Sequence, residues 1–178
     1  MRDPSTPAPL PHRLQRLRAY RWLLTLAGGV LLLDQSSKGW ISARLPLHSY
    51  GPDSAITVVP DFFYIVHVGN TGAAWSMFSG KSPFLALLAA VTLAAIYLWR
   101  HQLGLRQATA QIAFGLLTGG IAGNLVDRLA HGYVVDFLDF HFGPYTYPSF
   151  NFADASICVG VFLYLIWSVR QPVPPRAP

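Results

Sequence analysis

The sequence predicts a membrane protein that is mainly α-helical, with four transmembrane helices, two short extracytoplasmic strands and an amphipathic helix on the membrane surface. Composition is the first reason: of 178 residues, 52% are hydrophobic and only 12% are charged, which is too apolar for a soluble domain of this length. Spacing is the second, because four apolar segments approach or reach the length that crosses about 30 Å of hydrocarbon. We therefore expect lipid to be the main solvent.

The basic residues orient these four segments. We expect a membrane domain of residues 22–170 with spans at about 22–44, 83–99, 107–128 and 152–169. Residues 1–21 are expected to form a disordered basic leader, and residues 171–178 a Pro-rich tail. Nine of the eleven Arg then lie on one side, which the positive-inside rule identifies as the cytoplasm, so both termini are expected there.

The first span begins as a signal peptide would, but no small-residue cleavage site follows, so we interpret it as an uncleaved helix. Near its far end it carries Asp34 and Lys38, four residues apart and therefore on one helix face. The two residues either form an interfacial ion pair that lets the helix emerge into water, or face a polar cavity inside the bundle. The sequence leaves both alternatives open.

The segment between the first two spans is too varied to be a plain connector. Residues 56–68 are rich in β-branched and aromatic side chains and are interrupted by Pro60, which predicts two short strands. Residues 70–78 combine small residues, which allow close backbone approach, with Trp75 and Phe78, which suit the headgroup level. This pattern predicts a short amphipathic surface helix.

The third span carries two features on its helix faces. Three glycines recur every four residues and indicate close packing against another helix: Gly115, Gly119 and Gly123. Asn124 and Asp127 follow on one side of its last turn, and we expect Asp127 to form a structural ion pair with the adjacent Arg128.

Carboxylates gather at the predicted outer surface. All eight acidic residues are Asp, and half of them lie in one short stretch: Asp127, Asp136, Asp139 and Asp154. Two carboxylates that share a proton can activate water without a metal, and the apolar setting of Asp136 after two Val favours its protonated form by raising its pKa. Asp154 is either the partner in such a pair or the acid of a capping box with Asn151. Asp139 and His141 are expected to be solvated.

Other chemistries fit the sequence less well. With no Glu and no H-E-x-x-H pattern, a metal site is the weaker alternative, and no G-x-S-x-G motif indicates a serine protease. The single cysteine, Cys158, is interpreted as a small buried hydrophobic residue. A proton-coupled transporter or channel is the alternative from another class, but four spans without inverted repeats speak against it. A purely structural scaffold leaves the Asp cluster unexplained, and the scattered Arg do not predict a nucleic-acid partner.

Five motifs occur in order along the chain: DQSSK at 34–38, NTGAAW at 70–75, GGIAGNLVDR at 119–128, GYVVDF at 132–137 and FNFAD at 150–154. Together they resemble the lipoprotein signal peptidase family, also called signal peptidase II or prolipoprotein signal peptidase. The resemblance runs from Asp34 to Gly160 and excludes the leader and the tail. It implies a four-helix aspartyl endopeptidase with a small extracytoplasmic β-cradle and a surface helix, without metal or cofactor. The catalytic residues that it implies are Asp136 and Asp154. It also implies supporting or substrate-binding roles for Asp34, Lys38, Asn70, Gly72, Asn124, Asp127, Arg128 and Asn151.

The resemblance further implies a substrate and a location. The substrate is a bacterial prolipoprotein that carries diacylglycerol on its lipobox Cys and is cut just before that Cys. The protein is then a multi-pass protein of the bacterial cytoplasmic (inner) membrane, surrounded by membrane lipid, with its active site on the extracytoplasmic side. Susceptibility to globomycin-type cyclic peptides is implied as well.

Overall fold

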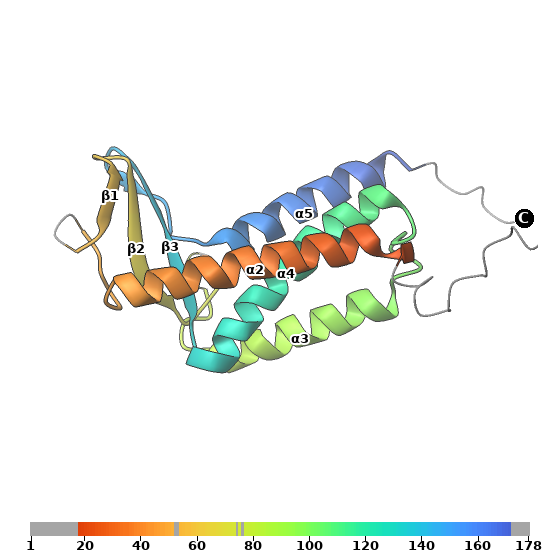
Figure 1. Ribbon diagram of the computed structural model, residues 1–178, viewed down its shortest axis with the longest axis horizontal. Helices are drawn as coiled ribbons and strands as arrows, with labels where there is room; N and C mark the ends of the chain where they lie inside the picture. The colour runs from red at the N-terminus through yellow and green to blue at the C-terminus, as the bar shows by residue number, and fades with distance from the viewer. Residues whose placement is uncertain (1–17, 52–53, 74, 76, 172–178) are drawn as a thin grey trace, which may run out of the picture.

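The computed structural model of the chain describes residues 18–51, 54–73, 75 and 77–171. These residues form four long helices with a small sheet at one end (Figure 1): α2 Arg21–Arg44, α3 Ser82–Leu98, α4 Ala108–His131 and α5 Phe152–Val169. α2 and α4 end near the sheet, whereas α3 and α5 begin there. Residues 1–17 of the expected leader and 172–178 of the expected tail lie outside the described residues.

α4 is the central helix and contacts the other three. A Cβ atom placed on Gly119 would lie 2.8 Å from the backbone oxygen of Ala27, so α4 approaches α2 more closely than a side chain would allow. On another face of α4, Gly120 packs against the backbone of Ala153 in α5. The close packing that the glycine spacing predicts is therefore confirmed, and it brings polar residues of three helices together at the sheet end.

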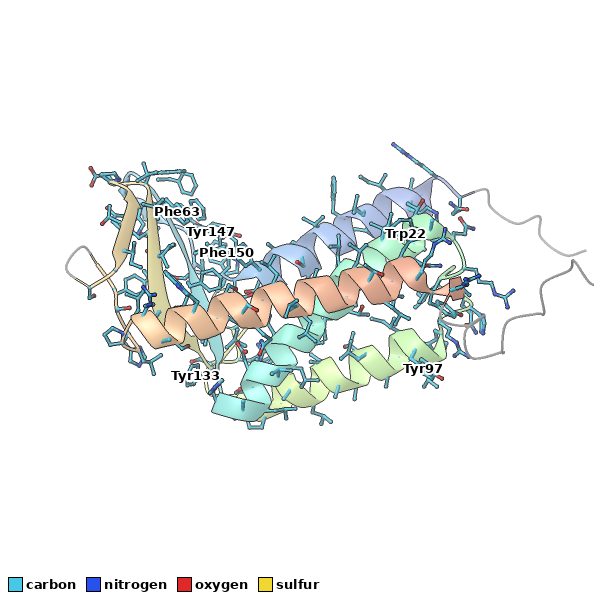
Figure 2. All side chains as sticks on the ribbon, viewed as in Figure 1. Trp22, Phe63, Tyr97, Tyr133, Tyr147 and Phe150 are labelled. Atoms are coloured by element: carbon cyan, nitrogen blue, oxygen red, sulfur yellow. The ribbon has the colours of Figure 1, made fainter. Side chains whose placement is uncertain are left out.

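The helix surfaces are apolar where they do not pack on one another. Among the helices that the structure describes, α4 and α5 are long and apolar enough to cross a membrane, and α3 is a shorter apolar helix of 17 residues. Large apolar side chains remain exposed along α3 and α5, including Leu87, Val91, Phe162 and Leu165. Figure 2 shows Trp22 and Tyr97 at the end remote from the sheet, and Phe63, Tyr147 and Phe150 at the sheet itself.

The sheet is antiparallel and has the strand order β1-β2-β3-β4, with bounds Ile56–Val59, Phe63–Asn70, Val134–Phe142 and Tyr145–Thr146. The two short strands expected on either side of Pro60 are confirmed as β1 and β2. In the β2–β3 pairing, Val68 is opposite Asp136 and Asn70 is opposite Val134. This register places Asn70, at the end of β2, beside the carboxylate of Asp136.

Two expectations about the outer segments need correction or stay untested. Asp139 is 1% exposed within β3 rather than solvated, because the chain at Phe150 forms a β-bridge with neighbouring Leu138 and covers this part of the strand. The amphipathic helix expected over residues 70–78 falls partly on residues 74 and 76, which lie outside the described residues, and residues 71–73 and 77–80 form bends and turns.

Candidate active site

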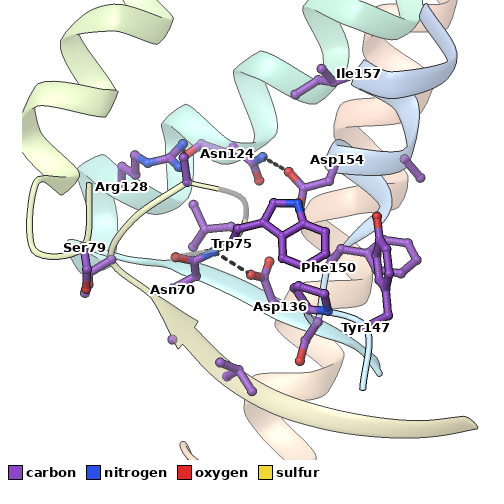
Figure 3. A pocket seen from close by; sticks show the side chains of 18 of the residues that line it. Asn70, Trp75, Ser79, Asn124, Arg128, Asp136, Tyr147, Phe150, Asp154 and Ile157 are labelled. Carbon is purple, nitrogen blue, oxygen red and sulfur yellow. Dashed lines mark hydrogen bonds between the residues drawn. The ribbon is translucent and has the colours of Figure 1, made fainter. Parts of the chain in front are cut away.

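The Asp residues of the GYVVDF and FNFAD motifs line one cavity between the sheet and the adjoining ends of α4 and α5 (Figure 3). Its volume is about 630 Å³. Asp136 comes from β3 and Asp154 from the first turn of α5, so the fold joins two motifs that are 18 positions apart in the sequence. A cavity of this size, lined by two carboxylates and two side-chain amides, is the main candidate for a functional site.

Asn151 holds both carboxylates. Its side-chain Nδ2 donates to Asp136 Oδ1 at 2.7 Å, and its backbone N–H donates to Asp154 Oδ2 at 3.3 Å. Asn151 also accepts from the backbone N–H of Asp154 at 2.9 Å, which completes a capping box at the start of α5. The two alternatives for Asp154 are thus not exclusive: it caps the helix and also faces the cavity.

A second amide completes the contacts of each carboxylate. Asn70 Nδ2 donates to Asp136 Oδ2 at 2.9 Å, and Asn124 Nδ2 donates to Asp154 Oδ1 at 2.7 Å; both bonds are drawn in Figure 3. Each carboxylate therefore keeps a defined orientation, and no Arg or Lys of the described residues forms an ion pair with it. Neutral donors of this kind fix a carboxyl group in place and still allow it to gain or lose a proton.

One buried cation connects α2 and α4 behind the cavity. Lys38 Nζ lies 2.8 Å from Asp34 Oδ2 and 3.0 Å from Asp127 Oδ2, and it donates to Asn124 Oδ1 at 2.9 Å. Lys38 is 3% exposed and Asp34 is fully buried, so the pair faces the interior of the bundle and not the interface. The predicted ion pair between Asp127 and Arg128 is wrong: within the described residues, the ionic partner of Asp127 is Lys38.

The two carboxylates bound to Lys38 also reach the backbone beside the cavity Asp residues. Asp127 Oδ2 accepts from the backbone N–H of Val135, the residue before Asp136, at 3.0 Å. Asp34 Oδ1 accepts from the backbone N–H of Ala153, the residue before Asp154, at 3.0 Å. Lys38 thus forms ion pairs with both Asp34 and Asp127. Each of these two carboxylates holds the chain one position before a cavity carboxylate.

The remaining motif residues connect the end of β2 with α4. The backbone N–H of Gly72 donates to Asn70 Oδ1 at 2.8 Å, and its carbonyl oxygen accepts from Arg128 Nη2 at 3.0 Å. A Cβ on Gly72 would lie 2.6 Å from the backbone oxygen of Met77, so no other residue fits without moving this loop. The structure therefore brings all ten sequence-predicted site residues into one connected group.

Sequence reasoning missed three residues. Gln35 donates to Asp127 Oδ1 at 2.9 Å and to the backbone oxygen of Gly123 at 3.2 Å; its place beside Asp34 in DQSSK was the available signal. Asp139 is paired with His141, which the two-residue period of a strand places on the same face. Cys158 was expected to be buried, but it is exposed and lines the cavity.

The environment of Asp136 raises its pKa from 3.8 to about 7. Burial is the largest cause, and the negative charge of Asp154 acts in the same direction, while hydrogen bonds from Asn70 and Asn151 and the charge of Lys38 act against it. The carboxyl group of Asp136 can therefore still hold a proton near neutral pH.

We expect Asp136→Asn to stabilise the fold at alkaline pH. The pKa of Asp136 is higher in the folded parent protein than in the unfolded chain, so the neutral side chain contributes to the stability of the fold. This contribution is complete below about pH 4 and is lost as pH rises through about 7. Asn is neutral throughout, so the melting temperature of the variant should equal the parent's near pH 4 and exceed it by about 5 °C at pH 8. Thermal unfolding in detergent across this range measures the difference, and a difference that does not change with pH would contradict the raised pKa.

Within the described part of the chain, no three His, Cys or Asp side chains cluster as ligands for a metal ion. The assignment of the whole chain comes from its relatives: residues 26–170 match the family model described as signal peptidase (SPase) II. The chain belongs to the signal peptidase II family. The resemblance of its five motifs is thereby confirmed.

Curated relatives of this signal peptidase II chain match it over most of its length. It is 38% identical over 161 residues to the lipoprotein signal peptidase of Nitratidesulfovibrio vulgaris. The aligned segment covers 88% of this chain and 94% of the relative. It is 40% identical over 165 residues to the lipoprotein signal peptidase of Shewanella baltica. The aligned segment covers 89% of this chain and 89% of that relative.

Solved structures agree with this family. A bacterial membrane enzyme determined by the in meso method at 2.3 Å resolution is similar with a TM-score of 0.71 and 30% identity, over 85% of this chain and 94% of that one. A second bacterial membrane enzyme, at 1.9 Å resolution, gives a TM-score of 0.69 and 31% identity, over 84% of this chain and 94% of that one. The chain is therefore a peptidase and a membrane protein, mainly helical with a small sheet.

Proposed function

We propose that this signal peptidase is an aspartic endopeptidase that removes the signal peptide from diacylglyceryl-modified prolipoproteins by cutting before the lipidated Cys. The observation that carries the proposal is the pair Asp136 and Asp154, which face one cavity and are both bound by Asn151. The other members of the ten-residue group support the pair, and the mechanism requires no metal or cofactor.

The pair can hydrolyse a peptide bond while sharing one proton. Ionised Asp154 takes a proton from a water molecule as that water attacks the carbonyl carbon, and protonated Asp136 gives its proton to the carbonyl oxygen. When the tetrahedral diol collapses, the carbon–nitrogen bond breaks, Asp154 gives its proton to the leaving nitrogen, and Asp136 regains a proton from the diol. The raised pKa of Asp136 supports its role as the proton holder.

The position of the cavity suits a lipid-modified substrate. It lies where apolar helices meet the sheet, and its lining changes from Ile157 and Cys158 on α5 to the polar and aromatic residues Tyr50, Asn70 and Ser149. A peptide that carries two acyl chains leaves a bilayer only at high cost, so its protease must present water and acids at the membrane surface. Globomycin-type cyclic peptides are expected to compete for this cavity.

Cleavage of a synthetic diacylated lipobox peptide by the purified full-length protein tests the proposed function. We expect a single cut before the lipidated Cys, identified by mass spectrometry, and an unchanged rate in saturating EDTA, because proton sharing replaces a metal-bound water. The unlipidated peptide is the matched control and should be cleaved poorly. A rate that EDTA abolishes and an added divalent ion restores would overturn the aspartic mechanism.

We also propose that all four helices span the bacterial inner membrane, with both termini in the cytoplasm and the cavity outside. Arg side chains lie over aromatic rings at both ends of the helices, an arrangement suited to the two headgroup regions: Arg21 on Trp22, Arg100 on Tyr97 and Arg44 on Trp40. The charges in the middle of α2 do not oppose spanning, because Lys38 and Asp34 neutralise each other inside the bundle.

Reporter fusions test this topology. A reporter fused after Gln102, in the loop between α3 and α4, is expected to be active only as a cytoplasmic reporter. Reporters fused after Gly51 or Tyr145, both at the sheet end, are expected to be active only outside the cytoplasm. The reverse pattern would place the carboxylates in the cytoplasm and contradict the proposal.

A further inference from the structure

A third carboxylate beside the cavity has no part in the mechanism above. Asp139 lies on β3, three residues after Asp136, and is 1% exposed. A buried carboxylate is costly unless it is paired, and Asp139 has two side-chain partners. His141 Nε2 lies 2.7 Å from its Oδ2, and Ser149 Oγ donates to its Oδ1 at 3.3 Å.

The directions of these hydrogen bonds follow from the chemistry of the groups. An ionised carboxylate only accepts, so the single hydroxyl proton of Ser149 points to Asp139. Tyr50 Oη lies 3.1 Å from Ser149 Oγ and must then be the donor in that contact. A directed chain runs from Tyr50 through Ser149 to Asp139, and it ties the loop before β1 to the segment before α5.

This chain forms one wall of the cavity. Tyr50 and Ser149 line the same cavity as Asp136 and Asp154, and their chain neighbours Ser49 and Phe150 form β-bridges with His67 and Leu138 of the sheet. Ile157 lies farther along α5, and Figure 3 shows it on the opposite side of Asp154 from Tyr147 and Phe150. The cavity therefore has a helix side and a sheet side: Asp154 belongs to the first turn of α5, and Asp136 belongs to β3.

We propose that Asp139 is a positioning residue that orients Tyr50 and Ser149 to bind the polypeptide on the outer side of the cleaved bond, which is the first few residues of the mature lipoprotein. The inference rests on the proposed peptidase function. Since the Tyr50 proton points to Ser149 and the Ser149 proton points to Asp139, each of the two hydroxyl oxygens keeps a lone pair that can accept a backbone N–H group of the substrate. The wall thus recognises an extended chain through its backbone, whatever its sequence.

Two lipidated peptides of different length test this inference on the full-length enzyme. The short peptide ends one residue after the lipidated Cys, and the long one continues for about five residues more, roughly 17 Å of extended chain. For Ser149→Ala we expect the KM of the long peptide to rise about threefold to tenfold, with kcat and the KM of the short peptide changed less than about twofold. Ser149→Thr, which keeps the hydroxyl, should restore the parent KM.

Thr146→Val is the matched control, because it removes a hydroxyl from the same outer segment. Among the described residues, this hydroxyl contacts the side chain of His141, at 3.4 Å. The variant should leave the KM of both peptides unchanged. An equal rise in KM for both peptides, or no change for either in Ser149→Ala, would overturn the inference while leaving the proposed function intact. If the parent enzyme cleaves neither peptide, the proposed function fails, and this inference with it.

Discussion

Asp136→Asn and Asp154→Asn are each expected to lower the rate of cleavage of a diacylated lipobox peptide about a thousandfold or more. Each change keeps the volume of the side chain but removes a group that must gain and lose a proton. Each new Asn keeps one of the two donated contacts at its position through its Oδ1, so the variants should still fold and insert. Steady-state kinetics on purified protein, with circular dichroism as a check of folding, measures the effect.

Asp61→Asn provides the matched control for these variants. Asp61 is an exposed residue at the turn between β1 and β2, and its left-handed backbone, with φ of 59°, tolerates Asn well. This variant should keep full activity. If either cavity variant keeps more than about a tenth of the parent rate, the acid–base pair is assigned to the wrong residues.

The double variant sharpens the same prediction. Two groups that act as one unit show effects that are far from additive, so Asp136→Asn combined with Asp154→Asn should be hardly slower than either single variant. Independent effects that multiply would indicate two separate functions, for example chemistry for one carboxylate and substrate binding for the other.

Much of this site could be predicted from the sequence because its residues come in short motifs. The motifs place Asp136 after two apolar residues and Asp154 beside Asn151, and both features persist in the structure. The strands beside Pro60 and the glycine face of α4 were predictable for a similar reason, since each depends on a local pattern.

The misassigned residues depend on contacts between distant segments. Neighbouring residues on a helix point in different directions, so Asp127 turns to Lys38 on another helix and not to Arg128 beside it. Asp139 is buried only because the chain near Phe150 returns to cover β3. The apolar sequence around Cys158 predicts that the residue avoids water, but it does not distinguish burial in protein from exposure to lipid or to a cavity.

Lys38→Met is expected to lower the free energy of unfolding by about 3 to 5 kcal/mol. Lys38 is the one cation in contact with both Asp34 and Asp127 among the described residues, and all three are nearly or fully buried. Without Lys38, two carboxylates stay close together with no positive charge between them. The loss should appear as easier unfolding in detergent mixtures and as a lower melting temperature.

Two further variants separate this charge effect from lost packing. Lys81→Met removes the only other Lys of the chain, which is exposed, and should change stability by less than about 0.5 kcal/mol. The triple variant Asp34→Asn, Lys38→Met and Asp127→Asn is neutral throughout and should recover most of the stability that Lys38→Met loses. Its Asn side chains can still accept from the backbone N–H groups of Ala153 and Val135, so the carboxylates of the cavity should keep their positions. Equal instability of the triple and single variants would mean that Lys38 stabilises the fold by its shape and not by its charge.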